Sequence, residues 1–275
     1  MTLALRPGPL IMGILNITPD SFSDGGRHMA RDAAVGRALE MLRQGADIID
    51  VGGDSTRPGA VPVPVPEQRR RVVDVIRSIR DATIDTPPIL SVDTTSDQVA
   101  EAALDAGADW INDTSAGRDS AGMLALAAER GAPLVLMHRQ GQPRTMQQSP
   151  SYRDVVAEVR TFLLERAAAA IAAGVAADHI LIDPGIGFGK RRAHNLALLA
   201  GLGELVSLGY PVLLGASRKR FMGALCDETD PTRLIHATTA TTALGVAAGV
   251  RIFRVHDVAA NRQAADVAFA IAAAS

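Results

Sequence analysis

The sequence predicts an α/β fold, a single (β/α)₈ TIM barrel whose active site lies at the carboxyl ends of its strands. Three observations predict it. Short aliphatic runs alternate with longer stretches rich in Ala, Leu and Arg along the whole chain. The short runs are almost entirely apolar, as expected of parallel strands that are buried on both faces. The length of 275 residues is close to the roughly 250 residues that one such barrel uses.

Eight short runs are expected to form strands because each is rich in aliphatic and β-branched residues. In chain order these are residues 10–17, 47–51, 89–92, 110–112, 134–137, 180–182, 212–214 and 251–255. The longer stretches between them are expected to be helices. They are residues 31–44, 67–81, 96–106, 120–130, 154–173, 194–207, 234–248 and 259–273. Glycine follows helical stretches at several places, and it favours the left-handed backbone that ends many helices. These glycines are Gly45, Gly107, Gly131, Gly174 and Gly209.

The main alternative fold is a doubly wound sheet, which usually carries a glycine-rich fingerprint after its first strand. The corresponding residues 16–20 read Asn-Ile-Thr-Pro-Asp and contain no glycine. No long low-complexity linker divides the chain. The barrel is therefore favoured, and residues 1–275 are expected to be one domain.

Composition narrows the classes of partner. A formal net charge of −2 gives no general attraction to nucleic acid or to an acidic membrane surface. No signal peptide is visible, and the uncharged stretch 237–250 is too short to span a bilayer. The single cysteine, Cys226, fits a reducing compartment, so a cytoplasmic protein is expected. With 3% aromatic residues, a stack of several aromatic rings around a ligand is not expected.

Polar residues stand where each predicted strand ends. In chain order they are Asn16, Asp50 with Asp54, Asp93, Asn112, His138, Asp183, Ser217 with Lys219, and Arg254 with His256. Each could instead cap a helix or a turn. However, the carboxyl ends of barrel strands converge on one face, where active sites are built. A polar rim around a ligand site is therefore the better interpretation.

The chemistry of this rim indicates a ligand with two different ends. Cationic side chains follow the last two strands, where barrels often bind phosphate. Acceptors from Asp93, Asn112 and Asp183 suit the N–H groups of a polar heterocycle. Zinc and serine-hydrolase motifs are absent from the sequence. Mg²⁺ held mainly by phosphate oxygens, with a protein oxygen such as that of Asn16, is compatible with these residues.

Two long motifs and six shorter ones closely resemble the dihydropteroate synthase family, and together they cover nearly the whole chain. The long motifs are residues 12–26, MGILNITPDSFSDGG, and residues 50–59, DVGGDSTRPG. The shorter ones are SVDT at 91–94, IND at 111–113, LMH at 136–138, DPGIGFGK at 183–190, SRKR at 217–220 and RVHD at 254–257. The sequence departs from the commoner family pattern at Asp54, where Glu is usual, at Ala116, where Gly is frequent, and at Arg220, where some members have Ser.

This resemblance implies a transferase of folate biosynthesis. Such an enzyme condenses 6-hydroxymethyl-7,8-dihydropterin diphosphate with 4-aminobenzoate and releases diphosphate. The residues that match the family's pterin site are Asp93, Asn112, Met137, Asp183, Phe188 and Lys219. Those that match the diphosphate site are Asn16, Thr56, Arg254 and His256, with Asn16 also the expected Mg²⁺ ligand. The aminobenzoate site and its loops match Asp20, Phe22, Arg57, Pro58, Ser217 and Arg220. Asp93, Lys219, Arg254 and His256 are the residues expected to be catalytic.

The resemblance further implies small-molecule substrates, inhibition by sulfonamides, a homodimer, and no nucleic-acid or membrane partner. Two alternatives remain open from the sequence. One is a methyltetrahydrofolate-binding barrel, against which Thr56, Arg254 and His256 argue, because that substrate carries no diphosphate. The other is a paralogue that binds pterin without catalysing a reaction.

Overall fold

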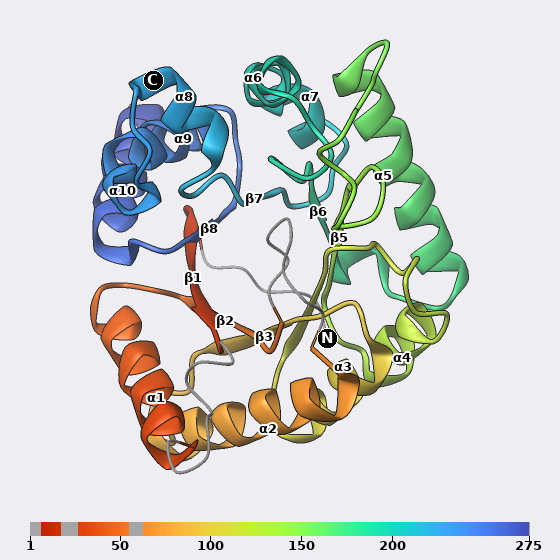
Figure 1. The fold of residues 1–275 in the computed structure, drawn as a ribbon, viewed down its shortest axis with the longest axis vertical. Helices are drawn as coiled ribbons and strands as arrows, with labels where there is room; N and C mark the ends of the chain where they lie inside the picture. Colours follow the sequence, from red (N-terminus) through yellow and green to blue (C-terminus); the bar gives the residue numbers. More distant parts are fainter. Residues whose placement is uncertain (1–6, 18–26, 55–62, 275) are drawn as a thin grey trace.

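Eight parallel strands form the centre of the structure, a computed structural model that describes residues 7–17, 27–54 and 63–274 (Figure 1). They are β1 (Leu10–Asn16), β2 (Ile48–Gly52), β3 (Ile89–Asp93), β4 (Trp110–Asp113), β5 (Leu134–Met137), β6 (Ile180–Asp183), β7 (Leu213–Leu214) and β8 (Ile252–Val255). Hydrogen bonding runs in the order β6-β5-β4-β3-β2-β1-β8-β7. A parallel bridge between Ile182 and Val212 joins β6 to the start of β7 and closes the barrel. The predicted fold class is confirmed.

Helices surround the strands in a ring (Figure 1). They are α1 (Arg27–Arg43), α2 (Val65–Ala82), α3 (Asp97–Asp105), α4 (Met123–Arg130), α5 (Val155–Ala172), α6 (Arg192–Ala200), α7 (Leu202–Val206), α8 (Arg220–Cys226), α9 (Ile235–Ala247) and α10 (Val258–Ala273). The prediction of one helix over 194–207 is wrong. Gly201 ends α6 and precedes α7 with a non-helical ψ of 15°, at a residue type with low helix propensity.

The amino-terminal part of the barrel interior is filled by apolar side chains. Alternate residues of a strand face the same side of a sheet, and one set of them forms a separate buried cluster inside the barrel. Its members are Leu10, Met12, Ile48, Trp110, Val135, Leu181, Leu213 and Ile252. This plug occupies the early part of seven of the strands, with Ile89 of β3 packed against it, and the space left inside the barrel is therefore at the carboxyl ends.

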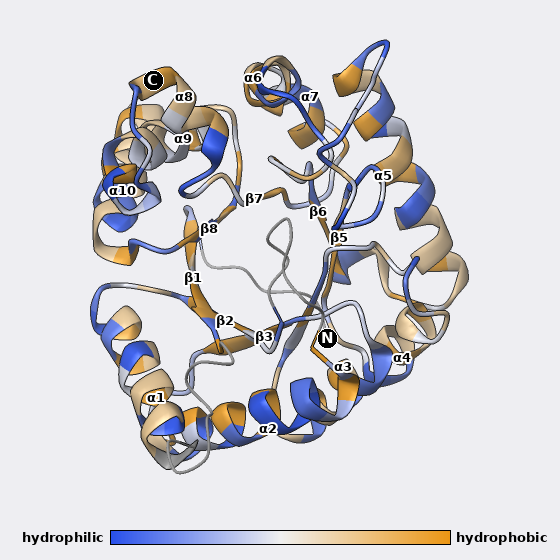
Figure 2. Cartoon of the chain, in the orientation of Figure 1, coloured by the Kyte–Doolittle hydropathy of each residue, from blue (hydrophilic) through white to orange (hydrophobic). Residues whose placement is uncertain are grey.

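A second, larger apolar core lies between the strands and the helices. Helix α2 shows how it forms, because Val72, Val75, Ile76 and Ile79 recur at helical spacing and are fully buried. Hydrophobic and hydrophilic segments accordingly alternate along α2 in Figure 2. Among the helices of the described residues, none combines the length and the hydrophobicity needed to cross a membrane.

Candidate active site

The carboxyl ends of the strands surround a cavity of about 940 Å³. Every predicted site residue that the structure describes lies in its wall. These residues are Asn16, Asp93, Asn112, Met137, Asp183, Phe188, Ser217, Lys219, Arg220, Arg254 and His256. Five other predicted site residues, Asp20, Phe22, Thr56, Arg57 and Pro58, lie outside the described residues.

Strand register brings the polar acceptors of the wall together. Asp93 at the end of β3 is the register partner of Asn112 in β4, and Met137 in β5 is that of Asp183 in β6. Because neighbouring strands lie roughly 4.8 Å apart, each pair places its side chains next to each other, and the two pairs form a band in the cavity wall. Asp183 and Asn112 are both buried, so any of their polar atoms left without a hydrogen bond would be costly.

Arg254 of β8 lies between two carboxylates. Its Nε donates to Asp50 Oδ2 at 2.6 Å, and its Nη2 donates to Asp93 Oδ2 at 2.6 Å. Asn112 Nδ2 donates to the same oxygen of Asp50 at 3.0 Å. Two donors that reach the cavity from different strands therefore share one buried carboxylate. Asp50 appears in the predicted rim, but the sequence assigns it no function.

Burial changes the protonation of two carboxyl groups in the cavity wall, those of Asp93 and Asp183. It raises the pKa of the Asp93 carboxyl to about 7, with the adjacent Arg254 opposing the shift. It likewise raises the pKa of Asp183 to about 6, against the hydrogen bond that Asp183 Oδ1 accepts from the backbone N–H of Gly185 at 2.7 Å. Both carboxylates are thus held at a cost that a cationic or proton-donating ligand can offset.

Lys219 is near enough to these carboxylates for their charges to affect its pKa. Burial lowers the pKa of its ammonium to about 8, and the charge of Arg254 adds to that effect while Asp183 and Asp93 oppose it. Its Nζ stands 4.2 Å from the centroid of the Phe188 ring, a cation–π geometry. Lys219 and Phe188 therefore form one wall segment that offers both a flat apolar face and a positive charge.

Ser217 and His256 are joined across the ends of β7 and β8. Ser217 Oγ accepts a hydrogen bond from the backbone N–H of His256 at 3.2 Å and lies 3.0 Å from its Nδ1. The intervening Arg218 is held away from them by its ion pair with Asp257, at 2.9 and 2.5 Å. Residues predicted for the aminobenzoate site and the diphosphate site are thus in direct contact.

The glycine-rich turn between Asp183 and Lys190 is held tightly against the end of β5. Buried Lys190 donates through Nζ to Gly185 O at 2.9 Å and to Phe188 O at 3.1 Å, and lies 2.8 Å from His138 Nδ1. Burial, together with the charge of Lys190, lowers the pKa of His138 to about 2, so His138 is neutral and can accept from Lys190. The sequence leaves His138 unassigned, and here it supports the turn that carries Phe188.

Gly185 is the residue of this turn least able to accept a side chain. Its φ is +66°, and a Cβ there would lie 1.9 Å from the backbone oxygen of His138. We expect Gly185→Ala to lower the free energy of unfolding by at least about 2 kcal/mol, through the left-handed backbone and the clash together. Urea denaturation measures this loss.

The control is Gly131→Ala. Gly131 has a similar φ of +59°, but a Cβ at this position would have no atom of the described residues within 4 Å. The substitution should cost only about 1–2 kcal/mol, from the backbone conformation alone. Equal losses in the two variants would show that the contact with His138 imposes no constraint.

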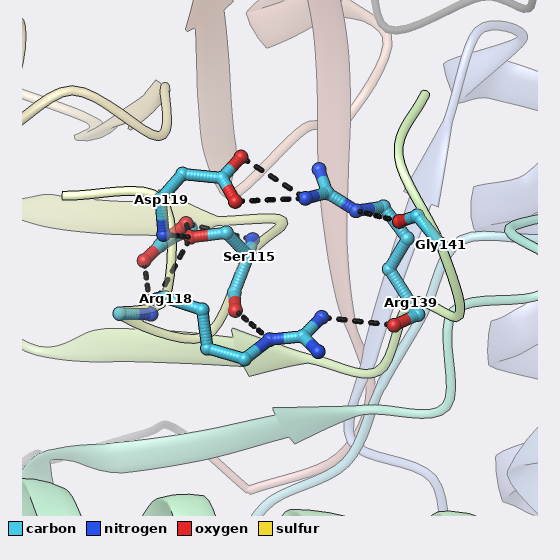
Figure 3. A network of polar contacts seen from close by, with 7 residues as sticks. Ser115, Arg118, Asp119, Arg139 and Gly141 are labelled. Atoms are coloured by element: carbon cyan, nitrogen blue, oxygen red, sulfur yellow. Dashed lines mark hydrogen bonds and ion pairs between the residues drawn. The ribbon is translucent and has the colours of Figure 1, made fainter. Parts of the chain in front are cut away.

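The loops after β4 and β5 are bound to each other beside the cavity (Figure 3). Arg139 Nη2 lies 2.9 and 3.0 Å from the two carboxylate oxygens of Asp119, and its Nε donates to Gly141 O. Arg118 donates to Ser115 O and to Arg139 O. Ala116, at the position where the family often has Gly, adopts a φ of 55° in this network. The network fixes the start of the segment that brings Met146 and Gln147 to the cavity.

The wall also contains residues that the sequence did not predict. They are Ile14, Thr114, Met146, Gln147, Gln148, Pro150, Gly187, Lys190, Arg191, Arg192, Asn195, Phe221, Pro231 and Thr232. Gly215 and Arg218, after the seventh strand where the sequence indicates a phosphate site, also line the cavity. The polar, proline-containing segment 141–150 signals a loop, but nothing in its sequence shows that it folds over the cavity. Among the described residues, no group of three or more His, Cys, Asp or Glu side chains is placed to hold a metal ion.

Comparison with known proteins gives consistent matches. The model of the family described as "Pterin binding enzyme" matches residues 12–256. A dihydropteroate synthase from Synechocystis sp. is 45% identical over 261 residues, covering 95% of this chain and 89% of that protein.

Solved structures of dihydropteroate synthases also match the chain. Dihydropteroate synthase from Xanthomonas albilineans, solved with 4-aminobenzoic acid, has a TM-score of 0.88 and 47% identity, covering 96% of this chain and 93% of that one. The enzyme in complex with 7,8-dihydropteroate has a TM-score of 0.85 and 44% identity, covering 96% and 94% of the two chains.

Proposed function

Because the chain belongs to the pterin binding enzyme family, and within it to the dihydropteroate synthases, we propose which residues of its cavity bind each substrate and stabilise the charges that develop in the reaction. The enzyme is a transferase that joins 6-hydroxymethyl-7,8-dihydropterin diphosphate to 4-aminobenzoate, giving 7,8-dihydropteroate and diphosphate. The observation that carries the proposal is a single cavity in which a band of buried acceptors adjoins a cluster of cations. A heterocycle and an anionic leaving group can then be bound side by side.

The pterin ring is bound by the acceptor band. Asp93, Asn112 and Asp183 receive the ring's N–H groups, while Phe188 and Met137 cover its faces. Lys219 adds a donor over Phe188. Carboxylates that are costly to bury become favourable when they accept hydrogen bonds from the ring, since each bond to a charged group contributes about 1.5–3 kcal/mol.

Arg254, His256 and Asn16 bind the diphosphate, and the family motif assigns Thr56, which lies outside the described residues, to the same substrate group. Gly52 leaves the space next to Asn16 open, because a Cβ there would lie 3.5 Å from Asn16 Oδ1 and 3.7 Å from Asp93 Oδ2. A neutral carboxamide oxygen of this kind suits Mg²⁺, which takes one or two protein oxygens and otherwise binds substrate phosphate. When bound, Mg²⁺ neutralises charge on the departing diphosphate.

Bond breaking at the pterin CH₂ leaves a cation that the electron-rich ring stabilises. The C–O bond electrons leave with the diphosphate, whose growing charge is met by Arg254 and His256. Asp93 and Asp183 favour the positive ring, so the wall stabilises charge of both signs as it develops. The amine nitrogen of 4-aminobenzoate then attacks the CH₂ and afterwards loses a proton to solvent. No nucleophile from the protein is required.

The aminobenzoate site lies at the outer part of the cavity. Ser217 and Arg220 contact this substrate from the end of β7 and the start of α8, together with Asp20, Phe22, Arg57 and Pro58. Arg220 is exposed at the cavity wall, and its guanidinium suits the substrate's carboxylate.

Asp183 should show opposite effects on stability and on binding. Its pKa is raised from 3.8 to about 6, so the folded protein keeps this proton at a pH where the unfolded chain has lost it. The contribution of Asp183 to the free energy of unfolding therefore falls as pH rises from about 4 to about 6, and stays low above that. Asp183→Asn should make the ligand-free protein about 1–3 kcal/mol more stable at pH 8, while pterin affinity falls about tenfold or more.

Urea denaturation at pH 4.5 and 8, with pterin titration calorimetry, checks both effects. The gain in stability should shrink at pH 4.5, where Asp183 is protonated in the folded wild-type protein. A variant that is less stable at pH 8 and binds pterin normally would contradict this assignment.

The decisive assay mixes purified protein, Mg²⁺, the pterin diphosphate and 4-aminobenzoate, and detects 7,8-dihydropteroate by mass spectrometry. Product formed at a rate proportional to enzyme concentration supports the proposal. Pterin binding without product would instead identify a pterin-binding protein that is not a synthase.

A homodimer in the cytoplasm is the proposed working form. Exposed apolar side chains on adjacent helices support it, with Leu244 of α9 70% exposed and Val267 and Ile271 of α10 61% and 66% exposed. Light scattering on the purified protein should give twice the chain mass, and Leu244→Glu should reduce it. Ile84→Glu is the control, because Ile84 is 80% exposed but lies in the connection after α2.

A further inference from the structure

Asp50 occupies the layer of the barrel directly beneath the cavity. It sits in β2 and is fully buried, and it is not part of the cavity wall. Its register partners are Ile14 in β1 and Ser91 in β3, so its backbone is fixed on both sides. The plug residue Ile48 precedes Asp50 in β2, and the Asp50 carboxylate contacts the side chains of Asn112 and Arg254.

One oxygen of Asp50 connects two residues with different expected tasks. Asp50 Oδ2 accepts from Asn112 Nδ2 at 3.0 Å and from Arg254 Nε at 2.6 Å. Within the described part of the chain, Oδ1 has no hydrogen-bond partner, and neither does the buried hydroxyl of Ser91. All of the hydrogen bonds of this carboxylate that the structure describes are therefore made with Asn112 and Arg254, two residues of the cavity wall.

The contact with Asn112 decides which end of that amide a ligand meets. A carboxylate can only accept, so the group that faces Asp50 must be the NH₂ end. The carbonyl oxygen of Asn112 is then the end available to the cavity. A neutral residue at position 50 could pair with either end, and the amide would lose its fixed direction.

The contact with Arg254 fixes the guanidinium in the same way. Nε is directed to Asp50 and Nη2 to Asp93, and the described residues provide no hydrogen bond to Nη1. The planar group is therefore held by two edges, with Nη1 left for an anion. Asp50 also supplies a fixed negative charge beneath the ring-binding band, where the cation develops.

We propose that Asp50 is a positioning residue. Its one carboxylate orients Asn112 in the pterin site and Arg254 in the diphosphate site. This inference rests on the proposed function. It assigns Asp50 two separable tasks: orienting the acceptor that reads the pterin ring, and orienting the guanidinium that meets the leaving group.

The first test is Asp50→Asn, with binding of 6-hydroxymethylpterin measured by calorimetry and with steady-state kinetics. Pterin affinity should fall about tenfold, and kcat should fall about tenfold or more as well. Ser91→Ala is the matched control, since it removes a buried hydroxyl that bonds to none of the described residues in the same layer. It should leave pterin affinity and kcat within about twofold of the wild type.

The second test combines Asp50→Asn with Asn112→Asp in one protein, so that the carboxylate and the amide exchange positions. Asn112→Asp alone places two carboxylates together and should bind pterin poorly. In the double variant the amide at 50 can donate to the carboxylate at 112, which again presents an oxygen to the cavity. Pterin affinity should recover to within about threefold of the wild type, while kcat stays low because Arg254 no longer contacts a carboxylate at position 50.

This split between affinity and turnover is not expected of a residue that only stabilises the fold. Normal affinity and kcat in a folded Asp50→Asn protein would overturn the proposal. Failure of the exchanged pair to recover pterin affinity over the two single variants would also overturn it. Wild-type protein that binds pterin but makes no product would instead contradict the proposed function, because the pterin measurements need no turnover.

Discussion

Asp93→Asn should abolish most synthase activity, lowering kcat/KM by about 10³-fold or more. The variant loses a charged acceptor for the pterin ring, which contributes about 1.5–3 kcal/mol to binding. It also loses a negative charge close to the developing cation, and removal of one such preorganised group typically costs about 10²–10³ in kcat. Steady-state kinetics with both substrates, together with calorimetry using the pterin alone, separate these two losses.

The pH dependence of activity tests whether the ionised carboxylate of Asp93 is the active form. Burial raises the pKa of Asp93 to about 7, so wild-type activity should rise with pH as Asp93 ionises. This limb should be absent from the residual activity of Asp93→Asn. Activity that is independent of pH between about 6 and 8 in the wild type would contradict ionised Asp93 as the active form.

Asp113→Asn is the control for a buried aspartate at the same level. Asp113 is fully buried, and it accepts from Ser115 and from the backbone of Gly117 rather than facing the cavity. Its replacement should lower the free energy of unfolding by about 1–3 kcal/mol and leave pterin affinity unchanged. Weaker pterin binding in Asp113→Asn would mean that damage to the fold explains the Asp93 result.

Arg254→Ala should reduce both activity and stability strongly. It leaves Asp50 and Asp93 buried without their shared cation, and breaking a buried ion pair in this way costs about 3–5 kcal/mol. The loss should be smaller at pH 5 than at pH 8, because Asp93 can then bind a proton in the folded state. Urea denaturation at the two pH values measures it.

Ligand binding separates this structural effect from the functional one. Arg254→Ala should weaken the pterin diphosphate far more than free 6-hydroxymethylpterin. Arg262→Ala is the control, because Arg262 also pairs with two carboxylates, Asp47 and Asp266, away from the cavity. It should lower stability but bind both ligands normally. Equal losses of both ligands in Arg254→Ala would place the anion site elsewhere.

Much of the fold could be predicted from local sequence. The fifth strand has the predicted bounds, and the other seven differ from the prediction by one residue at one or both ends, because buried parallel strands are marked by aliphatic runs. Helix ends are less certain, since they depend on hydrogen bonds at the termini. α4 begins at Met123, three residues after the predicted start, and the predicted sixth helix is divided at Gly201.

The candidate site, too, could be predicted from the sequence only in part. Most polar residues that end the strands line the cavity as the sequence predicts, since a barrel brings all carboxyl ends to one face. Asp50, Asp54 and His138 were predicted in the same rim but are not part of the cavity wall. The contribution of Met146, Gln147, Arg191 and Arg192 to the wall does not follow from the sequence, because those side chains reach it through loop conformation. Nothing local to segment 141–150 specifies that it folds over the cavity.

The sequence by itself determined the barrel, its family and most polar residues of the rim, because aliphatic runs, glycine positions and long motifs are local properties. Only the tertiary structure decided how those residues pair. Asp50 lies 62 positions from Asn112 and 204 from Arg254, and their hydrogen bonds exist only because the closed barrel places β2, β4 and β8 around one axis. The low aromatic content shows the same distinction. It excluded a stack of rings but could not reveal that Phe188 and Lys219 form one face of the cavity.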